Sequence, residues 1–176
     1  HQARRFDSTV ELDELFQALR NVWIMNIIQV LLNKKIELTP SVFAYSMLYP
    51  CTDNFLDSRS RSENEKKNLN SWIEGRLGGA QVSPAFANLD VLFNLIECEF
   101  PRTQFPLVFK SVLAIQIAQR RAMIQGNVPL RVEDILQLSF AKGGASVAAH
   151  GYLVNGDISE AQANFLFGFG VFLQLL

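Results

Sequence analysis

The sequence predicts an all-α fold, and three observations support that prediction. Apolar residues recur at gaps of three and four over most of the chain, which is the period of one helix face. Helix-start and helix-stop signals, such as Thr39-Pro40 and Gly78-Gly79, separate these stretches at ordinary helix lengths. Neither a sustained two-residue alternation nor a hairpin signature indicates a strand. We expect about seven helices in one domain.

The expected helices follow one another with short connections. Residues 10–34 open the series with one apolar face, formed by Leu12, Leu15, Phe16, Leu19, Trp23, Ile27, Val30 and Leu31. A second helix begins at Thr39-Pro40, with Thr39 as cap, and Pro50 bends it or begins a new turn. Gly78-Gly79 ends the helix expected over residues 69–77, and Ser83-Pro84 caps the next. The remaining helices are expected over residues 107–125, ended by Gly126-Asn127, over 130–153, and over 158–176 with Ser159 or Asp157 as cap.

Composition excludes several classes of protein. The 176 residues are 49% hydrophobic, enough for a sizeable core in a single domain over residues 1–176. The formal net charge of -1 argues against a nucleic-acid partner, which usually meets a strong basic excess. The apolar runs are shorter than a membrane span, so we expect no transmembrane segment. Two cysteines and a polar N-terminal stretch favour a reduced, cytoplasmic setting.

An acidic motif is the first candidate site. If residues 53–57 are helical, Asp53 and Asp57 project from the same face, one turn apart. Two carboxylates at that spacing suit Mg²⁺, which completes its shell with water and phosphate oxygens. Asn54 adds a carbonyl oxygen nearby, although it points about 100 degrees away from Asp53. The alternative interpretation is a pair of acids on a solvated helix face.

Cations follow the acidic motif closely. Arg59 and Arg61 come next in the chain, as a diphosphate-binding site would need. The alternative for such cations is a solvated loop that neutralises the acids.

The motif Asp53-Asn54-Phe55-Leu56-Asp57 resembles the first aspartate-rich motif of class I isoprenoid synthases. The usual form has aspartate at both leading positions, whereas the second is Asn54 here. This variant is similar to the motif of bacterial large terpene synthases, and the trailing Ser58-Arg59-Ser60 fits that comparison.

Two further segments resemble polyprenyl diphosphate synthases, in the same order along the chain. Residues 130–136, followed by Lys142-Gly143-Gly144-Ala145, resemble the stretch around that family's Lys-Thr-Gly signature, with Gly143 where the family has Thr. Residues 169–176 resemble the run into the second aspartate-rich motif, so two aspartates are expected just beyond Leu176. The chain thus resembles a partial domain, and we expect it to lack turnover by itself.

The resemblance implies a helical bundle around a central cavity, truncated before its last helices. It implies Mg²⁺ held by Asp53 and Asp57, and a prenyl diphosphate whose phosphates contact Arg59, Arg61 and Lys142. Asn54 and Gln174 would face the cavity. The implied reaction is ionisation of the prenyl diphosphate to a carbocation, as in a terpene synthase. A homodimer is also expected, because dimers are common among such proteins.

Two other functions remain open. A chain-elongating prenyltransferase would need a second site with further arginines, and the spacing of Arg59 and Arg61 differs from the usual pair. A non-catalytic helical scaffold or regulatory subunit is compatible with Asn54 and with the incomplete motif set. Zinc enzymes and serine or cysteine hydrolases fit poorly, because His1 and His150 are the sole histidines and neither accompanies a nucleophile motif. His150 is expected in the core.

Overall fold

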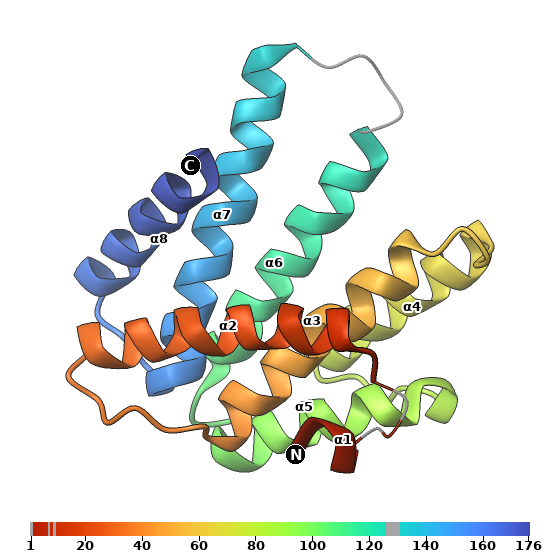
Figure 1. Ribbon diagram of the computed structural model, residues 1–176, viewed down its shortest axis with the longest axis horizontal. Helices are drawn as coiled ribbons and strands as arrows, with labels where there is room; N and C mark the ends of the chain where they lie inside the picture. The colour runs from red at the N-terminus through yellow and green to blue at the C-terminus, as the bar shows by residue number, and fades with distance from the viewer. Residues whose placement is uncertain (1, 7, 9, 126–130) are drawn as a thin grey trace. The chain divides into compact units, whose positions relative to one another are not determined.

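The computed structural model describes residues 2–6, 8, 10–125 and 131–176, and all regular structure among them is helical (Figure 1). This confirms the all-α prediction. The chain divides into two compact units, His1–Leu69 with Ser83–Pro101 and Asn70–Val82 with Arg102–Leu176. The single domain over residues 1–176 remains a prediction. The expected stop at Gly126-Asn127 and the start at Leu130 lie outside the described residues.

The first unit is built around the helix that carries the acidic motif. It contains α1 (Gln2–Phe6), α2 (Leu12–Leu31), α3 (Pro40–Asp57), the first turns of α4 (Glu63–Leu77), a 3-10 helix (Pro84–Phe86) and α5 (Ala87–Glu99). Helix α3 packs against both α2 and α5. Ten of its residues are buried, so α3 forms the centre of this unit.

The start of α3 is fixed by three separate groups. Thr39 is the N-cap, and its hydroxyl accepts the Val42 N–H at 3.4 Å, as the sequence predicts. Pro40 occupies the first turn, where its missing N–H needs no partner. The Ser41 N–H donates to the Glu99 carboxylate at 2.7 Å, which the sequence did not suggest. Carboxylates at a helix N-terminus also interact favourably with the helix dipole.

Helix α3 continues through Pro50. Proline lacks the N–H that would bond the carbonyl four residues earlier, so the ladder loses one bond at this point. The Thr52 hydroxyl donates to the Leu48 carbonyl at 2.8 Å and lies 3.2 Å from the Tyr49 carbonyl. Because the helix persists, residues 49, 53 and 57 keep helical spacing.

Helix α2 has two apolar sides, and the larger one is exposed. The buried residues are Ala18, Met25, Ile28 and Gln29. The face that the sequence marked as apolar lies opposite and remains largely exposed, at Leu12, Phe16, Leu19, Trp23, Ile27, Val30 and Leu31. The spacing therefore predicted the helix correctly, but it did not predict which face packs against α3.

The second unit contains the last turns of α4 together with α6 (Pro106–Gln125), α7 (Val132–Asn155) and α8 (Glu160–Leu175). Helix α7 lies between α6 and α8 and packs against both (Figure 1). Ser159 caps α8, and its hydroxyl accepts the Gln162 N–H at 3.2 Å, which confirms one of the two expected caps. Gly156 ends α7 with a positive φ of 75°, as expected of the Asn155-Gly156 turn.

Arg102 secures the end of α4, where Gly78-Gly79 stops the helix as predicted. Its guanidinium donates to the carbonyl of Arg76 at 3.0 Å and to that of Leu77. The same group lies 3.8 Å from the centre of the Phe109 ring. A cation at a helix C-terminus satisfies carbonyls that have no partner within the helix.

Two findings bear on the expected setting. Within the described residues, no helix is long and apolar enough to cross a membrane. Cys51 and Cys98 both lie in the described part of the chain, and they do not form a disulfide with each other.

Candidate functional site

The acidic motif lies on the last two turns of α3. Asp53 is partly exposed and Asp57 is exposed, and their helical spacing places both carboxylates on one side of α3. Ser58 follows as the C-cap, and its N–H donates to the Asn54 carbonyl at 3.0 Å. The helical geometry assumed for this pair in the sequence is thus the geometry that the structure has.

Tyr49 extends this acidic face by one further turn. Burial raises the pKa of its phenol above the usual 10, and the negative charges of Asp53 and Asp57 raise the pKa further. Arg20 of α2 has the opposite effect on this pKa, so its guanidinium also lies close to the group. At neutral pH Tyr49 is therefore a protonated hydrogen-bond donor beside two carboxylates. The i, i+4 spacing of Tyr49 from Asp53 was the available sequence signal.

Asn54 does not point the same way as the two aspartates. Its amide donates to the Glu14 carboxylate of α2 at 3.0 Å. Glu14 also accepts the Glu11 N–H at 2.9 Å, within the capping box of α2. Asn54 is exposed and ties α3 to the start of α2, whereas the resemblance implied a residue facing a cavity.

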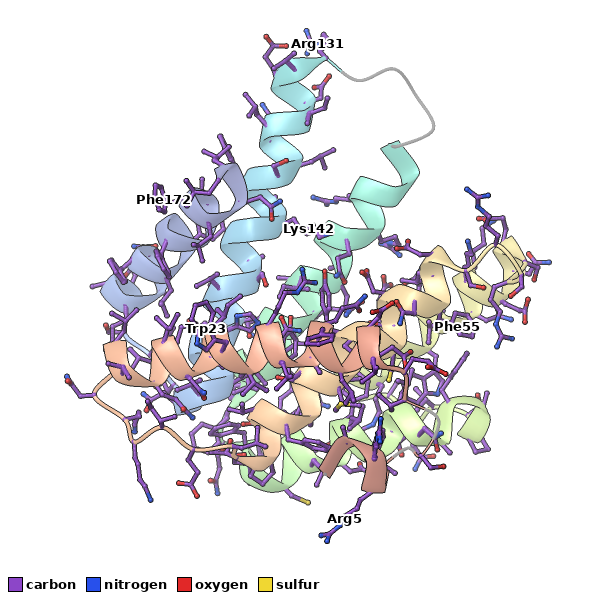
Figure 2. The ribbon with its side chains drawn as sticks, in the orientation of Figure 1. Arg5, Trp23, Phe55, Arg131, Lys142 and Phe172 are labelled. Atoms are coloured by element: carbon purple, nitrogen blue, oxygen red, sulfur yellow. The ribbon has the colours of Figure 1, made fainter. Side chains whose placement is uncertain are left out.

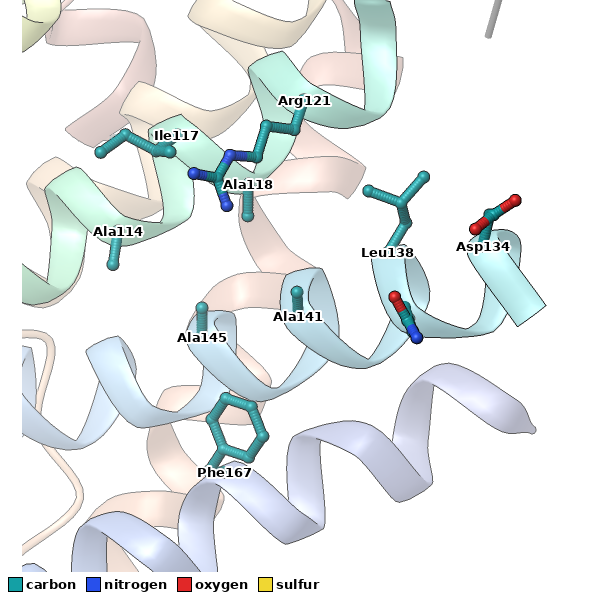
Figure 3. A pocket seen from close by; sticks show the side chains of 10 residues that line it. Ala114, Ile117, Ala118, Arg121, Asp134, Leu138, Ala141, Ala145 and Phe167 are labelled. Atoms are coloured by element: carbon teal, nitrogen blue, oxygen red, sulfur yellow. The ribbon is translucent and has the colours of Figure 1, made fainter. Parts of the chain in front are cut away.

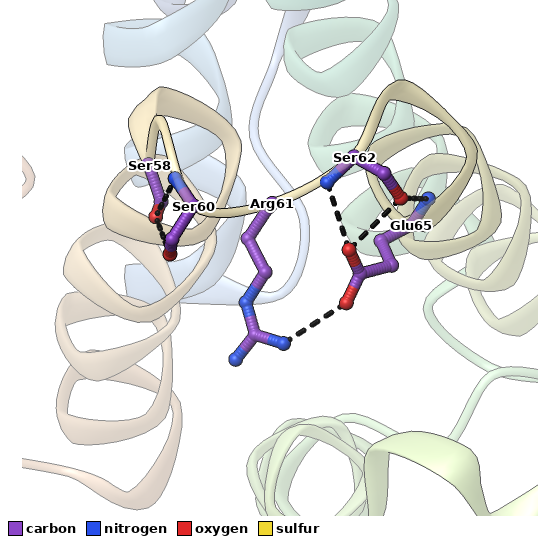
Figure 4. Close-up of polar contacts among 5 residues, drawn as sticks. All are labelled: Ser58, Ser60, Arg61, Ser62 and Glu65. Atoms are coloured by element: carbon purple, nitrogen blue, oxygen red, sulfur yellow. Dashed lines mark hydrogen bonds and ion pairs between the residues drawn. The ribbon is translucent and has the colours of Figure 1, made fainter.

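Arg61 takes part in the turn between α3 and α4 (Figure 4). Its guanidinium donates to Glu65 at 3.0 Å and lies 4.6 Å from the centre of the Phe55 ring. Glu65 also accepts the Ser62 N–H at 2.8 Å and the Ser62 hydroxyl at 2.9 Å. The hydrogen bonds from Ser62 and Arg61 lower the pKa of Glu65. Arg61 therefore has a structural partner, whereas Arg59 is exposed in the same turn.

Lys142 and Gln174 belong to the second unit. Lys142 lies near the middle of α7 and is partly exposed (Figure 2), and Gln174 is exposed near the end of α8. The two positions are linked through Gly143, because a Cβ there would meet the Gly170 carbonyl at 2.6 Å and the Gln174 Cβ at 2.7 Å. The segment that follows Lys142 is thus in direct contact with the segment that carries Gln174.

Glycines make this helix pair unusually close. A Cβ on Gly144 would lie 2.5 Å from the Phe167 ring, and a Cβ on Gly170 would overlap the Gly143 carbonyl. Nothing lies within 4 Å of a Cβ at Gly168, which faces away from the contact. Gly143 thus occupies a position where a side chain could not fit without a shift.

A hollow of about 570 Å³ lies in the second unit among α6, α7 and α8. Most of the residues that line it are apolar, and they include the small residues Ala118, Ala141 and Ala145 and the aromatic Phe167 (Figure 3). Arg121 of α6 supplies a cation to the lining, while Asp134 and Gln137 supply further polar groups. Asp134 is paired with Arg131 at 3.3 Å, at the start of α7.

The first unit has a smaller hollow beside α3, of about 370 Å³. Cys51 and Phe55 line it together with Leu69 and residues 84–89. On a helix these two positions lie opposite the side of Asp53 and Asp57. The acidic face and this hollow are therefore separate features.

The donor set fits a hard cation that keeps part of its shell for other ligands. No group of three or more His, Cys, Asp or Glu side chains arranged to hold a metal ion occurs among the residues that the structure describes. Mg²⁺ is commonly bound through one or two carboxylates plus substrate phosphates and water. Asp53 and Asp57 supply that number of carboxylates, so the residues present are compatible with Mg²⁺.

His150 is not available for chemistry. The side chain is 1% exposed within α7, as expected for a core residue. Burial lowers its pKa from 6.5 to about 4, so the imidazole is neutral at physiological pH.

Comparison with protein-family models, with curated proteins and with solved structures gives no match to this chain.

Proposed function

We propose that this chain forms part of a Mg²⁺-dependent enzyme that ionises a prenyl diphosphate, as a terpene synthase does. The observation that carries the proposal is the shared side of Asp53 and Asp57 on the last turns of α3, with Tyr49 one turn before them. That arrangement is what the resemblance to the first aspartate-rich motif implies. The all-α architecture and the glycine contact between α7 and α8 are compatible with it.

Ionisation breaks the bond between the allylic carbon and the diphosphate oxygen. The electron pair leaves with the diphosphate, so groups that stabilise its growing negative charge lower the barrier. Mg²⁺, when bound, supplies most of that stabilisation. Asp53 and Asp57 would hold the ion through carboxylate oxygens.

Other residues of the chain would also stabilise the negative charge on the leaving diphosphate. Tyr49 has a raised pKa, so at neutral pH its phenol can donate a hydrogen bond to an anion beside the two carboxylates. Arg20 is a cation of the same unit whose charge acts on Tyr49, and it is a better placed phosphate ligand than Arg61, which is bound to Glu65. Arg59, Arg61 and Lys142 remain proposed phosphate ligands.

A carbocation also requires walls that exclude water. The hollow lined by Ala118, Ala141, Ala145 and Phe167 is apolar along most of its wall, as the hydrocarbon part of a prenyl diphosphate requires. An aromatic face such as that of Phe167 can additionally stabilise a cation.

Binding to the chain itself is the first test, with inorganic diphosphate and Mg²⁺ as the probes. Together they are expected to raise the melting temperature, by roughly 3 °C at about ten times the dissociation constant. Asp53→Asn and Asp57→Asn should each abolish this rise. Glu37→Gln, an exposed acid elsewhere in the first unit, is the matched control and should leave the rise unchanged.

Turnover is measured on the protein that carries this chain, with prenyl diphosphates of increasing length. Mg²⁺-dependent diphosphate release from one substrate alone is the expected result. Release that requires isopentenyl diphosphate would instead identify a prenyltransferase. A folded protein with neither release nor a Mg²⁺-dependent shift in melting temperature would contradict both activities and favour the helical scaffold.

A further inference from the structure

An exposed apolar surface, which we call the α2 stripe, runs along α2 in the first unit. It is formed by Leu12, Phe16, Leu19, Trp23, Ile27, Val30 and Leu31. Its side chains are between 38% and 70% exposed, and Trp23 is the most exposed of them (Figure 2). Large contiguous apolar surfaces on proteins mark sites of association. The proposed ionisation reaction does not use this surface.

The spacing of the residues in the α2 stripe indicates that its binding partner is a helix. Leu12, Phe16, Leu19 and Trp23 are separated by alternating gaps of four and three, and Val30 follows Trp23 by seven. This is the heptad pattern by which two helices pack along a seam. The buried side of α2, with Met25 and Ile28, already packs within the unit, so the seam faces away from it.

The charges at the two ends of α2 indicate which helix packs on the α2 stripe and in which direction it runs. Glu11 and Asp13 are exposed at its N-terminal end, and Lys34 and Lys35 are exposed just beyond its C-terminal end. A second α2 running antiparallel brings the acidic end of each copy to the basic end of the other. Helix α8 has no basic residue in its last turn, so it lacks the cations that would match the acidic end of α2.

We propose that α2 is the interface of a two-fold symmetric homodimer in which the α2 stripes of two copies pack antiparallel. An axis between Asn21 and Val22 places Leu12 opposite Leu31 and Phe16 opposite Ile27 of the second copy. An interface of this kind is isologous, so each contact occurs twice.

The available area is sufficient for a stable interface. The exposed parts of the seven side chains amount to on the order of 800 Å² per copy, given side chains of about 150–250 Å² for the aromatic members. A standard protein interface buries roughly 800 Å² on each partner. Trp23 and Phe16 lie within the stripe and are the residue types that dominate binding energy in such contacts.

The oligomeric state of the chain is the test, measured by analytical ultracentrifugation from roughly 0.1 to 100 µM, the range in which many interfaces of this size dissociate. A dimer is expected, and Trp23→Glu should weaken it by at least roughly 30-fold. Phe172→Glu, an exposed aromatic position of α8, is the matched control and should leave the dissociation constant unchanged. A monomer throughout, or a dimer that Phe172→Glu disrupts and Trp23→Glu does not, would overturn the proposal.

Charge reversal tests the antiparallel direction. Asp13→Lys alone, and Lys34→Glu with Lys35→Glu, should each weaken the dimer by roughly tenfold. All three changes in one chain should restore affinity, because the reversed ends again face opposite charges. Failure of the combined variant to recover, while circular dichroism shows it folded, would contradict the antiparallel arrangement.

Trp23 itself reports whether a second copy covers the stripe. The chain has two tryptophans, Trp23 and the buried Trp72. In the variant Trp72→Phe, all tryptophan fluorescence therefore comes from Trp23. Its emission should shift to the blue, and its quenching by iodide should fall, as the concentration rises through the dimer midpoint. A Trp23 that is protected in the monomer would show that the stripe is covered within one chain and would overturn the proposal.

Discussion

The buried imidazole of His150 should make stability depend on pH in a defined window. Its pKa is about 4 in the folded chain and about 6.5 in the unfolded chain, because burial disfavours the charged form. Between these values the unfolded state binds more protons than the folded state. The free energy of unfolding therefore falls as the pH is lowered through this window.

The size of the effect follows from the two pKa values. Complete titration of a difference of this size contributes about 3 kcal/mol, and about 2 kcal/mol of it is lost between pH 7.5 and pH 5. Below pH 4 both states are protonated, and no further loss arises from this group. The loss at pH 5 is a substantial fraction of the typical stability of about 5–15 kcal/mol.

Urea unfolding of the chain and of His150→Leu at both pH values isolates this contribution. Leucine has a similar volume and does not titrate, so the variant should lose about 2 kcal/mol less than the parent between pH 7.5 and pH 5. Carboxylates titrate in both proteins, and their effect cancels in the difference. Equal losses in the two proteins, or a His150 resonance that titrates near pH 6.5 by NMR, would refute the reasoning.

Three other contacts can be tested by substitution. Gly170→Ala should destabilise the chain by about 1–3 kcal/mol, because the new methyl group meets the facing backbone carbonyl of α7, whereas Gly168→Ala should raise the melting temperature, because its Cβ meets nothing and alanine favours helix. Arg102→Met should cost about 2 kcal/mol in urea unfolding by removing two bonds to the end of α4, and a loss below a few tenths would contradict this capping role. Asn54→Asp should cost about 1 kcal/mol at pH 7, because the new carboxylate faces that of Glu14. Glu14→Gln in the same chain should recover the lost stability, as measured by thermal unfolding.

The helices themselves were largely predictable because their signals are local. Thr39 and Ser159 act as the caps that the sequence indicated, and Gly79 and Gly156 have the positive φ values that helix stops require. At Pro50 the sequence indicated a bend or a new turn, and α3 continues through this residue. Ser62 and Glu65 begin α4 with reciprocal hydrogen bonds, so that helix starts earlier than the apolar pattern indicated.

The partners of individual side chains were not predictable, because they come from distant parts of the chain. The Glu99 carboxylate that caps α3 is 58 residues from Ser41, and the Arg102 guanidinium reaches carbonyls 25 and 26 residues away. On α2 the sequence pattern gave one apolar face, while α3 packs on the other. Apolar spacing identifies a helix and its apolar face, but it does not report which face packs against a neighbouring element.

Asn54 illustrates how a cross-helix partner defines the role of a motif residue. In sequence it stands where the aspartate-rich motif that this segment resembles usually has aspartate. In the structure its amide donates to Glu14, which is already an acceptor for the N–H of Glu11. An aspartate at position 54 would place two carboxylates in contact there, so the amide is the side chain that this pairing requires. The acidic face of α3 therefore depends on Asp53 and Asp57, while Asn54 holds that end of α3 against α2.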